Sequence, residues 1–239
     1  MKIKLMGTAA IYSPYNSAST FVNNDLVVDL PNGILKQFLK DGDDISHVDT
    51  ILLTHMHGDH TADTPFFALY RMLRQQAESI TVVGPVGIRQ KILDMYNAYD
   101  FFDARDYVED GRANMNFIEM SEGSRIEVNG YTIEAHEVHH GNEAPALGYV
   151  INDKLGFTGD ASLCEGVEKI FAQAEAIVSD SSHMEGNDDH MGVDNLKYLS
   201  EKYGKKIICT HMRDNTREEL KKSTPENFIV GEDFLELEI

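Results

Sequence analysis

The sequence has 239 residues, of which 42% are hydrophobic and 26% are charged. This mixture is typical of a globular chain with a substantial core and excludes a disordered or fibrous protein. The chain contains no run of eighteen apolar residues, which excludes a transmembrane helix, and its first residues lack the long apolar core of a signal peptide. Cys164 and Cys209, the two cysteines, do not indicate a disulfide framework, so we expect a cytoplasmic protein.

The formal net charge is −19. Proteins that bind nucleic-acid polymers usually gain affinity by neutralising phosphates with clustered Lys and Arg side chains. An acidic surface repels a polyanion, and two divalent metal ions would leave the total charge strongly negative. We therefore expect a small-molecule substrate. A membrane is not expected as a partner, and the charge disfavours a nucleic-acid polymer.

The first half of the chain, to about residue 115, is predicted to contain both strands and helices. Thr64 can cap a helix that has Pro65 as its first residue. Apolar alternation and short apolar runs predict the strands. The strands are Lys2–Met6, Ser19–Val22, Leu26–Leu30, Thr50–Leu53 and Ile80–Val83, and further helices are Ile34–Leu39 and Ile88–Tyr96.

The second half, residues 116–239, is similar in kind. Asn129-Gly130 predicts a tight hairpin turn, because these residues tolerate positive φ angles. The expected strands are Arg125–Val128, Tyr131–Ala135, Leu147–Ile151, Leu155–Thr158, Ala176–Ser179 and Lys206–Thr210, with a helix over Val193–Tyr203. Two halves with matching element order predict one α/β domain over 1–239, a sandwich of two sheets with helices outside.

The strongest chemical signal is the segment His55-Met56-His57-Gly58-Asp59-His60, directly after a predicted strand. Side chains two apart in an extended segment point the same way, so His55 and His57 can bind one metal ion. Gly58 would let the chain turn sharply, after which Asp59 and His60 can bind a second ion. These ligand types suit zinc, and also manganese or iron. The alternative is a polar loop without metal, against which the rarity of the spacing argues.

These residues resemble the H-x-H-x-D-H motif of the metallo-β-lactamase superfamily. The opening Leu5–Ala10, followed by Pro14, Asn16 and Ser19, resembles the start of the ribonuclease Z and phosphodiesterase branch. The resemblance extends over most of the chain. It implies a four-layer αββα sandwich with two mixed β-sheets, two divalent metal ions, and a hydroxide that bridges the ions as the nucleophile.

The resemblance implies three further metal ligands. The first is a histidine at a strand end, for which we favour His140 over His139 because Val138 stands two residues before it. His136, further back on the strand, is interpreted as a surface or supporting histidine.

The other two are Asp160 in Thr158-Gly159-Asp160, as the carboxylate that bridges both ions, and His211 after the strand Lys206–Thr210. A turn residue and an ordinary strand-end histidine are the alternatives for these two. The implied ligands are thus His55, His57 and His140 on one ion, Asp59, His60 and His211 on the other, and Asp160 between them. Asp59 would also orient the hydroxide.

His190 precedes the predicted helix Val193–Tyr203, where related phosphodiesterases carry a histidine that is not a ligand. It could protonate the leaving oxygen or stabilise charge on phosphate. An ordinary loop histidine is the alternative. His183 is a weaker candidate, Asp180 is interpreted as support for a ligand histidine, and His47 is interpreted as a surface residue.

Only twenty positions separate His140 from Asp160, which leaves no room for the tRNA-gripping arm that many ribonuclease Z members carry there. Together with the charge, this favours a phosphodiesterase that acts on a small or cyclic nucleotide-like molecule. The main alternative is lactone or thioester hydrolysis, with Tyr149 or Tyr12 as oxyanion stabiliser. Endonucleolytic processing of tRNA 3′ ends and a non-hydrolytic metal-binding module rank lower.

Substrate-binding residues are not identified by any motif. A homodimer is a further hypothesis, with the helix Phe66–Met72, or Phe101 and Phe102, at the interface. Core packing is the favoured use of these aromatic side chains.

Overall fold

Two mixed β-sheets form the centre of the described residues. The computed structural model describes residues 1–74, 79–100, 108, 111, 114–142 and 145–239. Phe101 and Phe102, considered above for an interface, lie outside the described residues.

The first sheet has the order β14-β1-β2-β3-β4-β5-β6. Its strands are β1 (Lys2–Gly7), β2 (Ser19–Val22), β3 (Leu26–Val28), β4 (Thr50–Leu52), β5 (Ile80–Pro85), β6 (Met115–Met120) and β14 (Glu236–Glu238). β1 and β2 pair in antiparallel fashion, as do β2 and β3, whereas β3 to β6 are parallel. Asn23 and Asn24 have positive φ angles, which lets the chain reverse tightly between β2 and β3.

The second sheet has the order β13-β12-β11-β10-β9-β8-β7. Its strands are β7 (Arg125–Val128), β8 (Tyr131–Glu137), β9 (Leu147–Ile151), β10 (Leu155–Phe157), β11 (Ala176–Asp180), β12 (Lys206–Thr210) and β13 (Phe228–Val230). β7 to β10 are antiparallel and β10 to β13 are parallel. Asn129 and Gly130 both have positive φ angles, as the predicted turn requires.

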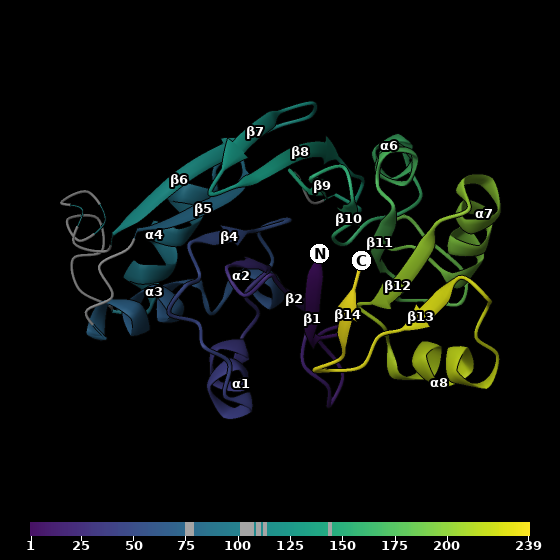
Figure 1. The fold of residues 1–239 in the computed structure, drawn as a ribbon, viewed down its shortest axis with the longest axis horizontal. Coiled ribbons are helices and arrows are strands. Elements are labelled where there is room, and N and C mark those ends of the chain that lie inside the picture. The colour runs from purple at the N-terminus through teal and green to yellow at the C-terminus, as the bar shows by residue number, and fades with distance from the viewer. Residues whose placement is uncertain (75–78, 101–107, 109–110, 112–113, 143–144) are drawn as a thin grey trace.

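Helices cover the outer face of each sheet (Figure 1). α1 (Ile34–Asp41), α3 (Thr64–Leu73) and α4 (Ile88–Ala98) lie with the first sheet, and the short α2 (Gly58–Thr61) follows β4. α6 (Glu165–Gln173), α7 (Val193–Tyr203) and α8 (Asp214–Lys222) lie with the second. Among the described residues, none of these helices combines the length and the apolar character needed to cross a membrane.

Three hydrophobic clusters separate the four layers. One contains Phe38 and Phe67 and lies between the first sheet and its helices. The middle cluster joins the two sheets and includes Leu5, Leu52, Tyr149 and Ile208. The third packs α6 and α7 on the second sheet. Burial of apolar area on both faces of each sheet explains why the parallel strands read as continuous apolar runs.

Several elements are absent from the sequence-based prediction. β6, β13, β14, α6 and α8 were not predicted. Of the side chains on α8, only Thr216, Arg217 and Leu220 are buried, so the helix carries no apolar stripe to recognise. β6 and β14 are edge strands with exposed side chains, and edge strands have weak apolar alternation. Thr64 is the first residue of α3 and not its cap, which is Asp63.

The ends of the parallel strands meet at one edge of the sandwich. Asp29 follows β3, and His55 follows β4 in the first sheet. Asp160 follows β10, Asp180 ends β11, and His211 follows β12 in the second sheet. Ligand sites of α/β proteins commonly form at the carboxyl ends of strands, and the polar cluster described next lies there.

Candidate metal centre

The histidine motif begins where β4 ends. His57 is extended and Gly58 opens α2, whose first turn is closed by a hydrogen bond from Thr61 Oγ1 to the His57 carbonyl oxygen. The chain turns at Gly58 as expected, but the turn does not depend on glycine, because its φ is not positive and a Cβ there would meet nothing within 4 Å. The chain changes direction because His57 is extended and the residue after it is helical. The ring nitrogens His55 Nε2 and His57 Nδ1 lie 3.0 Å apart.

A third ring joins these two. His140 Nε2 lies 3.4 Å from His57 Nδ1, and the ligand atoms of His55, His57 and His140 all lie within 4.8 Å of one another. The structure therefore brings His140 into the cluster. His139 is exposed and lines a different cavity, beside Cys164.

Asp59, His60 and His211 form a second group of the same dimensions. Asp160 lies between the groups, because its Oδ2 faces ring nitrogens from both. The distances from Asp160 Oδ2 are 3.2 Å to His211 Nε2, 3.4 Å to His60 Nε2, 3.9 Å to His55 Nε2 and 4.0 Å to His140 Nε2. All seven predicted ligand residues thus lie in one cluster.

Four of the five histidine rings of the cluster are oriented in the same way. In His55, His60, His140 and His211 the Nδ1 atom has an acceptor outside the cluster, so Nε2 faces inward. The Nε2 atoms of His60 and His211 are buried, and within the described residues neither makes a hydrogen bond, although both lie close to Asp160 Oδ2. Buried polar atoms are normally paired, so these two inward-facing nitrogens fit a role as metal ligands. Imidazole and carboxylate donors at this spacing could hold divalent ions.

Asp29 is the acceptor behind His60. Its carboxylate accepts hydrogen bonds from His60 Nδ1 at 2.8 Å and from the Thr54 backbone and hydroxyl at 2.9 Å each. Thr54 Oγ1 lies 3.0 Å from His55 Nδ1, so one carboxylate orients two cluster histidines. Sequence reasoning missed Asp29 and Thr54. The available signal was an acidic residue directly after an apolar strand.

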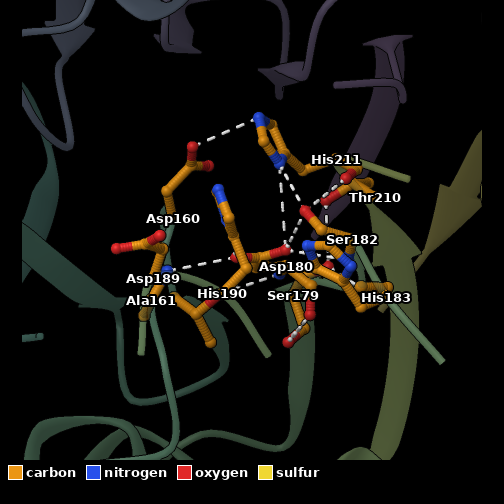
Figure 2. Close-up of polar contacts among 12 residues, drawn as sticks. Asp160, Ala161, Ser179, Asp180, Ser182, His183, Asp189, His190, Thr210 and His211 are labelled. Atoms are coloured by element: carbon orange, nitrogen blue, oxygen red, sulfur yellow. Dashed lines mark hydrogen bonds and ion pairs between the residues drawn. The ribbon is translucent and has the colours of Figure 1, made fainter. Parts of the chain in front are cut away.

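Ser182 and Asp180 form the corresponding support for His211 (Figure 2). His211 Nδ1 lies 2.8 Å from Ser182 Oγ, which donates to Asp180 Oδ1 at 2.7 Å. Asp180 is fully enclosed and is further held by the Ser182 backbone. Ser182 was not identified from the sequence. The sequence-based interpretation of Asp180 as a support residue agrees with this geometry.

His190 lies beside the cluster and is not one of the seven. Its Nδ1 donates to Asp180 Oδ2 at 2.8 Å, and its ring stacks on His211 with centroids 5.2 Å apart. The other ring nitrogen points toward the space between Asp160 and His211 (Figure 2). His183 is further from the cluster, with its centroid 6.0 Å from that of His190. His47 is exposed, and His136 is buried against Gln173, so the surface interpretation of His136 is wrong.

Burial and neighbouring charges act in opposite directions on the pKa values of the site. Burial alone would raise the pKa of Asp59, but His211 and His60 lower it to about 2. Burial would lower the pKa of His211, but Asp160 and Asp180 raise it to about 10. For His190 burial also acts to lower the pKa, and the hydrogen bond to Asp180 outweighs it and raises the pKa. The carboxylates of the cluster therefore stay ionised although they are buried, and their negative charge is balanced by positively charged partners.

The cluster opens into a cavity of about 770 Å³. One wall is formed by the cluster residues His57, Asp59, His140, Asp160 and His211, together with His190. The lining also contains Ile11 and Tyr12 from the loop after β1, and Arg213 from the start of α8. This volume is large enough for a nucleotide-sized ligand.

Comparison with known proteins places the chain in a family. The sequence profile described as Anti-Pycsar protein Apyc1 matches residues 1–234. The chain belongs to this family. Ribonuclease Z of Staphylococcus saprophyticus is 28% identical over 134 residues, which are 55% of this chain and 40% of that protein. Ribonuclease Z of Mycolicibacterium gilvum is 25% identical over 193 residues, 74% of this chain and 68% of that protein. The chain spans less than half the length of the first of these relatives.

Solved structures confirm the predicted fold of this Apyc1-family chain. A diphosphatase from the PhnP family aligns with a TM-score of 0.77 at 17% identity, over 100% of this chain and 97% of that one. The short form of human tRNase Z aligns with a TM-score of 0.75 at 18% identity, over 100% and 99%. These structures confirm the metallo-β-lactamase fold, and the sequence relatives named ribonuclease Z agree with the predicted branch. The relatives carry the names of hydrolases, which agrees with the predicted enzyme class.

One sequence-based prediction about the Apyc1-family chain is wrong. The net charge of −19 disfavoured a nucleic-acid polymer as a partner. The related proteins are named ribonuclease Z and tRNase Z, so this branch includes proteins that act on RNA. Net charge sums the whole surface, whereas a phosphate responds to the local field of the site it enters. The total charge therefore does not exclude such a partner.

Proposed function

We propose that this protein is a metal-dependent phosphodiesterase whose substrate is a small or cyclic nucleotide. The observation that carries the proposal is the position of His190, which is held by Asp180, stacks on His211 and lies close to Asp160, and which we assign as an acid and not as a metal ligand. Hydrolysis of a phosphodiester expels an alkoxide, and a positioned acid that protonates this leaving oxygen typically contributes about 10²–10⁴-fold to the rate.

We assign the seven cluster residues as ligands of two divalent ions, with zinc as the favoured metal. His55, His57 and His140 would hold one ion, Asp59, His60 and His211 the other, and Asp160 would contact both. When bound, the ions supply Lewis acidity at the phosphate and an activated water at neutral pH. Asp59 stays ionised because its pKa is about 2, so it can accept a hydrogen bond from an attacking water.

The protein's own groups complete the reaction. Asp180 raises the pKa of His190, which favours the protonated imidazole that the leaving oxygen needs. Arg213 lines the same cavity, and among the described residues its side chain makes no hydrogen bond or ion pair. In a chain with a net charge of −19, this free guanidinium supports an anionic substrate in the cavity.

Particular observations bear on two alternative functions. A lactonase would need an oxyanion stabiliser, but Tyr149 is fully buried and donates its hydroxyl to the Leu53 carbonyl oxygen at 2.9 Å. Tyr149 therefore does not support that activity, and Tyr12 is left as its candidate. A second candidate function is cleavage of an RNA phosphodiester, which the names of the sequence relatives favour.

The test compares two leaving groups in the metal-loaded protein. Replacing His190→Gln should lower kcat for a 3′,5′-cyclic nucleotide by about 10²-fold or more, because its leaving alkoxide needs a proton. Hydrolysis of bis(p-nitrophenyl) phosphate should fall far less, because p-nitrophenolate leaves without one. The matched control is His47→Gln, at an exposed histidine.

Four results would overturn the assignment. Equal losses on both substrates would show that His190 does not act as the acid. No phosphodiesterase activity in protein that binds two metal equivalents would end the proposal, and activity on a lactone alone would replace it. Cleavage of an RNA oligonucleotide with no turnover of cyclic nucleotides would establish the second candidate.

A further inference from the structure

A loop after β1 forms part of the lining of the cavity that contains the candidate metal centre. Residues Ala10, Ile11 and Tyr12 of this loop line the same cavity as His57 and His190. The loop joins β1 to β2, and it returns close to its own start, because the Thr8 and Ala9 backbone amides both donate to the Asn16 carbonyl oxygen. The segment between them is therefore a short closed loop that contributes to the cavity lining.

The backbone on both sides of Tyr12 is tied to the start of α8. The Ala10 amide donates to the Met212 carbonyl oxygen at 3.1 Å, and Ser13 Oγ donates to Asp214 Oδ1 at 2.6 Å. The Asn16 amide donates to Asp233 Oδ2 at 2.8 Å and closes the loop. Met212 follows the cluster residue His211 directly. The position of Tyr12 is therefore coupled to that of the metal centre.

The Tyr12 side chain itself is unused by the fold. It is 93% exposed, and within the part of the chain that the structure describes it makes no ring contact, hydrogen bond or ion pair. Tyr15, three residues later, differs. Its ring lies over the Arg217 guanidinium, with the Arg217 Cζ atom 4.4 Å from the centroid, so it packs within the protein. The backbone around Tyr12 is fixed by hydrogen bonds, and its exposed ring belongs to the cavity lining. This arrangement fits a ligand that stacks on the ring.

We propose that Tyr12 is the stacking platform for the nucleobase of a nucleotide whose phosphate lies at the metal centre, an inference that rests on the proposed function. Each base has an apolar π-face, and stacking on an exposed aromatic ring requires no match to the base edge. The phosphate and the base of one nucleotide are separated by a ribose, so a single cavity can hold the phosphate at its floor and the base at its mouth.

This subsite recognises a base by its ring and not by its hydrogen-bonding edge. Purine and pyrimidine nucleotides should therefore both bind. Ribose phosphate without a base should lose the contribution of the platform. Tyr12→Phe should keep that contribution, because it keeps the ring.

The chain contains no tryptophan, so a substituted tryptophan is a unique fluorescent reporter. We would prepare metal-loaded Tyr12→Trp and titrate it with a nucleoside 5′-monophosphate and with ribose 5-phosphate. The matched control is Tyr198→Trp, at an exposed tyrosine on α7 outside the cavity lining. Calorimetry on the original protein, Tyr12→Ala and Tyr12→Phe would give the dissociation constants.

The expected result is saturable quenching of Tyr12→Trp by the nucleoside monophosphate, and none by ribose 5-phosphate or in Tyr198→Trp. Tyr12→Ala should raise Kd for the nucleoside monophosphate about tenfold, with Kd for ribose 5-phosphate within about twofold, and Tyr12→Phe should match the original protein. An unchanged Kd in Tyr12→Ala would overturn the inference.

The two proposals fail separately in this design. Saturable, base-dependent quenching in a protein that hydrolyses no phosphodiester would support the nucleotide subsite and refute the proposed function. Hydrolysis of a cyclic nucleotide with the same KM in Tyr12→Ala would support the function and refute the subsite.

Discussion

Asp29 is a buried carboxylate whose hydrogen bonds reach two histidines of the cluster. It accepts from His60 Nδ1 and from the backbone and hydroxyl of Thr54, and Thr54 in turn contacts His55. Its φ of +59° is uncommon outside glycine, although Asp and Asn adopt it more readily than other residues. His211, on the other side of the cluster, has a φ of +51°. Backbone strain of this kind commonly accompanies functional sites.

Replacing Asp29→Asn should lower the affinity for the ion near His60 by about 10–100-fold, the usual effect of losing a partner behind a ligand histidine. The amide keeps an oxygen for the Thr54 backbone amide, but its NH₂ group would face His60 Nδ1, which is also a donor. Asn tolerates the positive φ, so the backbone need not change. Affinity can be measured by competition with a chelator of known zinc affinity.

The control for this substitution is Asp44→Asn, at an exposed aspartate beside His47. It should leave metal affinity unchanged within about twofold, as is usual for a surface substitution. Equal metal affinity in Asp29→Asn and the original protein would show that Asp29 only supports the fold.

At the scale of elements, one loop serves both the cluster and the proposed acid. The loop between β11 and α7 places the Asp189 carbonyl oxygen 2.7 Å from His140 Nδ1, and its next residue is His190. Asn187 holds this arrangement, because its Oδ1 accepts from the Asp189 and His190 backbone amides at 2.8 Å each. A side-chain oxygen that accepts from amides further along the chain stabilises a turn in this way.

Asn187→Ala should therefore weaken two properties together. We expect kcat for the cyclic nucleotide to fall by roughly tenfold and the pH at which His190 titrates in the kcat profile to change, because the loop no longer fixes the His190–Asp180 pair. Asn187→Asp keeps the accepting oxygen and should restore most of the activity. Kinetic pH profiles of the three proteins make the measurement.

A general loss of stability in Asn187→Ala would give a different result. If Asn187→Ala lowered Tm without changing the pH profile, and Asn187→Asp failed to restore kcat, the side chain would have no positioning role.

At the scale of the whole molecule, the cluster joins the two sheets. His55, His57 and His60 come from the segment after β4 of the first sheet, whereas Asp160 and His211 follow β10 and β12 of the second. Ions bound there would connect elements that otherwise meet through the apolar middle cluster. A ligand that binds only the folded state stabilises it by an amount set by its concentration relative to Kd.

Removal of metal should consequently lower thermal stability. With zinc at a thousand times its Kd, the loaded protein should be about 4 kcal/mol more stable than the stripped protein, which corresponds to a Tm difference of roughly 10 °C for a chain of this size. Differential scanning calorimetry with and without a chelator measures this difference, and His47→Gln provides a variant that should respond as the original protein does. Identical Tm values with and without the chelator would contradict metal ions that connect the two sheets.

Short-range patterns in the sequence were sufficient for the parts of this protein that depend on neighbouring residues. The segment His55–His60 carries its spacing within six residues, and Asn129-Gly130 specifies a turn by its own φ preferences. Strand alternation also favoured His140 over His139, which is where the structure places the two rings. Each of these inferences needs only the local geometry of the chain, which a sequence pattern encodes directly.

Tertiary structure decided what depends on residues far apart in the chain. Asp29 meets His60 across 31 positions, and Ser182 meets His211 across 29, so no local pattern links them. Helix α8 has no apolar stripe, and in the folded protein it packs against β13, which is distant from most of the chain in sequence. Tyr12 lines the cavity in a loop whose Ala10 and Ser13 are hydrogen-bonded to residues at the start of α8, about 200 positions away. The net charge misled for the same reason, since a sum over the sequence carries no information about which charges fold toward the site.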